Sequence, residues 1–123
     1  MFKDWKQFKK AWVKALRSGD YRQGQGTLVT YNEETCTDEF CCLGVAANLL
    51  IQKGHEGEWF ERDDMWFFGK PRGGHDNAIL CSVTSVPMWL RKRLTERGTE
   101  ATLTNMNDTG RSFSEIADYI EGL

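Results

Sequence analysis

The segment Phe40–Ile51 constrains the fold more than any other part of the chain. It is apolar on nearly every side and ends in Lys53-Gly54. It is too long for an ordinary strand, and a helix that is apolar all round belongs in a protein interior. The sequence therefore predicts a buried central helix over this segment, at the centre of the core.

Amphipathic helices are predicted at both ends of the chain. Residues 4–18 place apolar side chains at helical spacing after an N-cap at Asp4, and Ser18-Gly19 ends the pattern. Near the C-terminus, Ser112 and Glu115 form a capping box ahead of a second apolar stripe. The predicted buried residues of that last helix are Phe113, Ile116, Ala117 and Ile120.

The middle of the chain predicts a small, mainly antiparallel sheet. Its expected strands are 27–31, a hairpin over 58–68, and 78–83; 32–38 is expected to be a turn. Helices are expected from Pro87 to Gly98 and over 101–106, followed by a turn at 107–110. No linker divides the 123 residues, so we expect one α+β domain spanning 1–123.

Charge is distributed unevenly along the chain. Residues 1–22 hold seven lysines and arginines against two aspartates, which gives +5 and leaves −7 for the remainder of a chain of net charge −2. Such a helix could meet phosphates, an acidic partner or an anionic membrane, or could simply be a solvated face. The last helix carries Glu115, Asp118 and Glu121 and no basic residue, which disfavours DNA reading by that helix. Nucleic acid is therefore not an expected partner.

No membrane span or signal peptide is expected. The uninterrupted apolar runs, such as Leu49–Ile51, are only a few residues long, far short of the roughly 20 residues that cross a bilayer. The first residues are charged and lack the apolar stretch of a signal peptide. We therefore expect a cytoplasmic protein.

The four cysteines, Cys36, Cys41, Cys42 and Cys81, form neither paired C-x-x-C motifs nor a regular framework. They are expected to be reduced thiols, with no metal site and no cofactor. Cys41 and Cys42 stand where a loop enters the central helix, whose N-terminus favours a thiolate. With His75 as base and Asp76 as its orienting group, either cysteine could serve a hydrolase. The alternative is that both are buried core residues.

Two sets of residues are candidates for binding. Trp59, Trp66 and Phe68 lie near a glycine-rich loop, where an aromatic surface could anchor a partner or stack a planar ligand. The second set is polar and would form only if two glycine-bearing turns meet in space. Its members are Tyr21, Gln23, Asn107 and Asp108. Asn and Asp are also the residues that a turn requires on conformational grounds alone.

Three blocks of sequence, 12–24, 40–45 and 103–118, resemble a group of short proteins encoded by tailed bacteriophages. They read WVKALRSGDYRQG, FCCLGV and LTNMNDTGRSFSEIAD, and they stand in the same order in that group. The resemblance implies the cytoplasm of an infected bacterium. In that setting, the small size of the chain and its lack of catalytic spacing favour an accessory protein that binds a host or phage protein, or sequesters a small ligand, without catalysis. The cysteine-dependent hydrolase remains the alternative.

Overall fold

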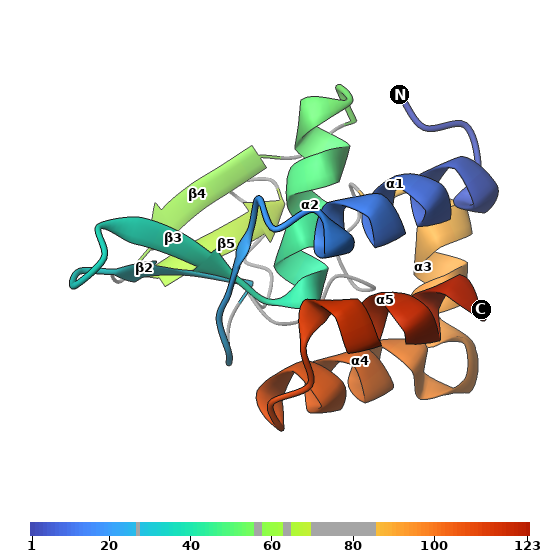
Figure 1. Ribbon diagram of the computed structural model, residues 1–123. Helices are drawn as coiled ribbons and strands as arrows, with labels where there is room; N and C mark the ends of the chain where they lie inside the picture. The colour runs from blue at the N-terminus through green and yellow to red at the C-terminus, as the bar shows by residue number, and fades with distance from the viewer. Residues whose placement is uncertain (27, 56–57, 63–64, 70–85) are drawn as a thin grey trace.

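The computed structural model describes residues 1–26, 28–55, 58–62, 65–69 and 86–123 (Figure 1). The helices are α1 (Trp5–Arg17), α2 (Cys42–Gln52), α3 (Met88–Thr95), α4 (Thr99–Asp108) and α5 (Phe113–Glu121), with a 3₁₀ turn at Glu96–Gly98. The strands are β1 (Arg22–Gln23), β2 (Val29–Asn32), β3 (Thr37–Phe40), β4 (Glu58–Arg62) and β5 (Met65–Gly69). These elements form an α+β domain, as the sequence predicts.

Helix α2 is the centre of the core, and this prediction is confirmed. It stands between the strands on one side and helices α1, α3 and α5 on the other (Figure 1). Eight of its residues, Cys42 to Ala47 with Leu49 and Leu50, are buried. The predicted start of this helix was wrong, because Phe40 belongs to β3, where it pairs with Val29. The helix begins at Cys42, after the N–H of Cys41 donates to the carbonyl of Leu28 at 3.1 Å.

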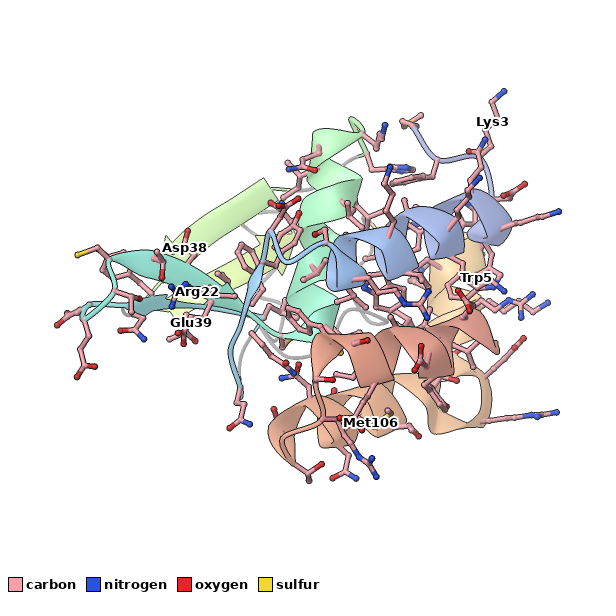
Figure 2. All side chains as sticks on the ribbon, viewed as in Figure 1. Lys3, Trp5, Arg22, Asp38, Glu39 and Met106 are labelled. Carbon is pink, nitrogen blue, oxygen red and sulfur yellow. The ribbon has the colours of Figure 1, made fainter. Side chains whose placement is uncertain are left out.

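Helix α1 forms as predicted and packs against α2 and α5. Its N-cap is Asp4, whose Oδ1 accepts a hydrogen bond from the N–H of Gln7 at 2.9 Å. The buried face consists of Trp5, Phe8, Trp12, Val13 and Leu16. Figure 2 shows nitrogen-tipped side chains projecting from the outer side of the helix. The basic residues thus surround an apolar stripe that is anchored in the core.

The three-stranded sheet has the order β1-β3-β2 and mixed direction. β2 and β3 are antiparallel, and β1 runs parallel to β3 with Arg22 opposite Glu39, a pair visible in Figure 2. The expected turn over 32–38 was too long, because β2 extends to Asn32 and β3 already begins at Thr37. The expected hairpin is confirmed as β4 and β5, which are antiparallel. The strand expected over 78–83 lies outside the described residues.

The C-terminal helices bring two corrections. The helix expected from Pro87 to Gly98 is α3, which ends at Thr95, and the separate 3₁₀ turn follows it. The expected short helix over 101–106 is the longer α4, so Asn107 and Asp108 lie in its last turn and not in a loop. Gly110, at φ 92°, completes the turn into α5. The predicted capping box is confirmed, since Ser112 Oγ accepts from the N–H of Glu115 and the Glu115 carboxylate accepts from the N–H of Ser112.

Part of the basic charge of α1 is used within the fold. The guanidinium of Arg17 pairs with Asp118 at 2.5 Å and with Glu121 at 2.9 Å, both on α5. Lys9 Nζ donates to the main-chain carbonyls of Glu121 and Leu123. The acidic last helix is therefore the internal partner of the basic first helix. In the described ranges, no helix is long and apolar enough to cross a membrane.

His55 holds the N-terminal segment against the core. Its Nε2 accepts a hydrogen bond from the N–H of Phe2 at 2.9 Å, and its ring stacks on the Phe2 ring at 5.7 Å between centroids. Burial, with a smaller contribution from the positive amino terminus, lowers the pKa of His55 from its ordinary value. Protonation would remove the lone pair that accepts the hydrogen bond.

We therefore expect stability to fall as the pH drops below about 6.5, the usual histidine pKa, because the unfolded chain then binds a proton that the folded protein resists. The loss is complete once the pH has passed the lowered pKa of the folded state. A His55→Gln variant keeps an acceptor but does not titrate there. Urea unfolding from pH 5 to 8 should show a pH-dependent difference between the two proteins. A constant difference would contradict this role of His55.

Candidate binding groove

An open groove of about 510 Å³ lies between the C-terminal half of α1, the segment that follows it, and α2. Its lining combines small or polar residues at the surface with apolar residues beneath them. They are Ala11, Lys14, Ala15, Ser18, Asp20, Tyr21, Asn48, Leu49 and Gln52. We call this set the α1–α2 groove.

The floor of the groove is apolar and its rim is charged. Ala11 and Ala15 are half-buried on α1, and Leu49 is buried on α2. Alanines at two positions on the same helix face leave a recess where longer side chains would fill the space between the helices. Lys14 and Asp20 are exposed at the rim. An apolar recess with opposite charges beside it can accept an aliphatic side chain and a polar main chain together.

Tyr21 is the predicted binding residue that lines this groove. Its hydroxyl accepts a hydrogen bond from Asn48 Nδ2 at 2.8 Å, and its ring meets that of Phe40 edge-on at 5.1 Å. Both contacts fix the orientation of the phenol ring against the end of β3. Tyr21 is therefore a preorganised wall of the groove.

The other three polar candidates meet elsewhere, at the end of α4. Asn107 is fully buried, and its Oδ1 accepts from Gln23 Nε2 at 3.0 Å and from the N–H of Cys42 at 3.2 Å. Its Nδ2 donates to the carbonyl of Gly24 at 2.6 Å. One amide thus joins β1, the start of α2 and the end of α4.

Neighbouring contacts extend this junction. Gln23 also donates to the carbonyl of Arg111 at 2.7 Å, and Gln25 donates to the carbonyl of Asn107 at 3.3 Å. Asp108 Oδ1 accepts from the N–H of Gly26 at 3.0 Å. The two glycine-bearing segments do meet in space, as the binding hypothesis required. The polar groups of these two segments form hydrogen bonds with one another, so the role of this cluster is structural. Of the four polar candidates, only Tyr21 lines the groove.

The two candidate nucleophiles are buried thiols. Cys41 is the N-cap of α2 and its Sγ accepts from the N–H of Gly44 at 3.3 Å, while Cys42 Sγ donates to the carbonyl of Leu103 at 3.6 Å. Burial raises the pKa of Cys41 to about 11 and raises the pKa of Cys42 well above its ordinary value. Burial therefore raises the pKa of each thiol by more than the hydrogen bonds at the N-terminus of α2 lower it. Both thiols are protonated at neutral pH. His75 and Asp76, the proposed base and its partner, lie outside the described residues.

Alkylation by iodoacetamide near neutral pH should separate the thiols. Cys36 is exposed, whereas Cys41 and Cys42 are buried. We expect Cys41 and Cys42 to react at least about 100-fold more slowly than Cys36, because the thiolate is the nucleophile, and burial both disfavours the thiolate of these two residues and shields their sulfur atoms from the reagent. Peptide mass spectrometry gives the three rates in one sample, and the urea-unfolded protein is the control. Labelling of Cys41 or Cys42 at the rate of Cys36 would restore the hydrolase hypothesis.

The aromatic candidates lie in the predicted hairpin. The register places Trp59 of β4 opposite Phe68 of β5, and Trp66 opposite Glu61. The glycine-rich loop that follows is outside the described residues. Within the part of the chain that the structure describes, no group of three His, Cys, Asp or Glu is arranged to hold a metal ion.

Sequence reasoning missed five polar residues of the groove, which are Lys14, Ser18, Asp20, Asn48 and Gln52. Asn48 carried a usable signal, since its amide is the one polar group within the apolar segment Phe40–Ile51 apart from the thiols. A polar side chain on an otherwise apolar helix marks the place where that helix meets a polar partner. Here that partner is the hydroxyl of Tyr21.

Comparison with known proteins places the chain in a family. No curated protein and no solved structure matches it significantly. The family model described as "Domain of unknown function (DUF8296)" matches residues 5–123, from the first turn of α1 to the end of the chain. The chain therefore belongs to the DUF8296 family.

Proposed function

We propose that this protein is a non-enzymatic binding module that engages a protein partner through the α1–α2 groove. The observation that carries the proposal is the composition of the groove: an apolar floor of Ala11, Ala15 and Leu49 beside exposed polar groups. Hot spots of protein interfaces combine an apolar recess with a polar surround in this way. The Tyr21–Asn48 hydrogen bond holds one wall in place before any partner arrives.

A protein segment suits the groove better than a small ligand. Sites for small molecules enclose most of the ligand surface, typically 70–90%. The α1–α2 groove is open to solvent, and its rim residues Lys14, Asp20 and Gln52 are exposed. The protonated state of Cys41 and Cys42 argues against the alternative, a cysteine-dependent hydrolase. A protein partner is accordingly the occupant that we propose.

The proposed setting is the cytoplasm of a phage-infected bacterium. It rests on the resemblance of residues 12–24, 40–45 and 103–118 to short proteins of tailed bacteriophages. Two of these blocks contribute to the groove or to the structure beside it, since residues 12–24 include Lys14 and Tyr21 and residues 40–45 open α2. In this setting the module would act on a host or phage protein.

Site-specific photo-crosslinking in infected cells tests the proposal. A diazirine-bearing lysine analogue that keeps the amine replaces Lys14 at the groove rim. The same analogue at Lys92, an exposed residue of α3, is the matched control. We expect a discrete crosslinked protein from position 14 and none from position 92. Equal crosslinking from both positions, or none from position 14, would remove the groove as the binding surface.

A further inference from the structure

The outer face of α1 carries a row of lysines that form no ion pair with the described part of the chain. Lys6, Lys10 and Lys14 recur every fourth residue, and all three are exposed. Residues four apart lie on the same face of a helix, about 6 Å from one another along its axis. No carboxylate occurs in α1 between Trp5 and Arg17. We call Lys6, Lys10 and Lys14 the lysine stripe.

The remaining cations of α1 have partners, which sets the stripe apart. Arg17 pairs with Asp118 and Glu121, and Lys9 donates to the main-chain carbonyls of Glu121 and Leu123. Among the residues that the structure describes, the ion pairs of α1 all belong to Arg17. Three aligned ammonium groups therefore face solvent without a counter-charge on their own helix. A surface of this kind is complementary to carboxylates.

We propose that the partner segment is acidic: its carboxylates lie along the lysine stripe while an aliphatic side chain enters the α1–α2 groove. This inference rests on the proposed function. Lys14 belongs to both surfaces, so the stripe runs into the rim of the groove. A helix with glutamate at every fourth position repeats its charges at the same interval of about 6 Å. An acidic amphipathic helix thus matches both the spacing of the charges and the apolar floor.

Nucleic acid fits the same surface less well. Phosphate backbones require positive charge throughout the contact, and single strands also need aromatic side chains on which bases stack. The groove places Asp20 at its rim and Ala11, Ala15 and Leu49 on its floor. A phosphate beside Lys14 would face this carboxylate and an apolar surface. The observations therefore favour a carboxylate-bearing protein segment.

Amide chemical shifts of the isotope-labelled full chain provide the test. The probe is an acetylated, amidated helical peptide with glutamate at every fourth position beside a row of leucines. A peptide with glutamine in place of each glutamate is its control. We expect the glutamate peptide to shift the amides of the lysine stripe and the groove, and the glutamine peptide to bind at least about tenfold more weakly.

Variants separate this inference from nonspecific attraction. Lys10→Glu with Lys14→Glu should weaken binding of the glutamate peptide about tenfold or more. Lys92→Glu with Arg97→Glu changes the net charge equally on exposed positions of α3 and the 3₁₀ turn, and should leave the affinity within about twofold. Equal weakening by both pairs, or equal binding of both peptides, would overturn the inference.

Further experiments test for other occupants and distinguish failure of this inference from failure of the proposed function. A DNA duplex that shifts the same amides at lower concentration than the peptide would overturn the inference in favour of nucleic acid. Shifts that depend on the concentration of the free protein would overturn it in favour of a second copy of the chain. The substitution Gln52→Trp fills the groove. If it abolishes binding while Lys10→Glu with Lys14→Glu does not, the groove is supported as the binding surface and the acidic partner is overturned. If neither change weakens binding, both proposals are overturned.

Discussion

A Gly44→Ala variant is expected to be destabilised by about 3 kcal/mol or more, although alanine is the better helix former. A Cβ at position 44 would lie 1.8 Å from the carbonyl oxygen of Leu28 and 2.7 Å from its carbonyl carbon. Both are main-chain atoms, and the same oxygen accepts the N–H of Cys41. The first turn of α2 would have to move away from the segment before β2. Urea unfolding measures the loss, which is a large share of a typical stability of roughly 5–15 kcal/mol.

Gly122→Ala is the matched control, because a Cβ there meets nothing closer than 3.6 Å, which is ordinary van der Waals contact. We expect its free energy of unfolding to stay within about 0.5 kcal/mol of the natural protein. If Gly44→Ala is as stable as this control, the close packing of α2 against Leu28 is wrong.

Replacing Asn107 with leucine is expected to cost about 3 kcal/mol or more. Leucine has nearly the same shape but offers no polar group, so the N–H of Cys42 and the carbonyl of Gly24 lose the partner that Asn107 provides. Each buried polar group left without a partner costs about 1–3 kcal/mol. Gln23 also loses its bond to Oδ1. Thermal and urea unfolding should both report the loss.

Asp108→Asn is the control for the Asn107→Leu substitution. It keeps an oxygen that can accept from the N–H of Gly26, and the side chain is exposed. We expect a change in stability of no more than about 0.5 kcal/mol. Equal stability of Asn107→Leu and Asp108→Asn would contradict the role of Asn107 as the junction of β1, α2 and α4.

Helices with a complete local signal could be predicted from the sequence. α1 has an N-cap at Asp4 and an apolar stripe, and α5 has the Ser112–Glu115 capping box. In these cases, nearby residues determine both the start of the helix and its buried face. The hairpin of β4 and β5 was equally evident from its alternation of aromatic and charged residues.

Elements that depend on distant contacts could not be predicted in the same way. β3 is a short polar strand that exists because β1 and β2 pair with its two edges. Asn107 extends α4 past the expected turn because its buried amide bonds to Gly24 and Cys42, far away in sequence. Propensity alone assigns such residues to a turn, and tertiary hydrogen bonds override it.

The groove was predictable only in part. Tyr21 was a candidate from its place beside a glycine-bearing segment, and Lys14 belonged to the basic helix. The recess itself arises from Ala11, Ala15 and Leu49, which read in the sequence as ordinary core residues. Only the crossing of α1 and α2 leaves them under an open surface.

The measurement that tests the groove most directly is retention of the partner identified by crosslinking at position 14. The proteins to compare are the natural chain, Gln52→Trp, which fills the groove, and Lys92→Trp, which places the same side chain on exposed α3. All three should unfold at the same temperature. We expect Gln52→Trp to weaken binding about tenfold or more and Lys92→Trp to leave it unchanged. Full retention by Gln52→Trp, or equal loss in both variants, would contradict the groove as the binding surface.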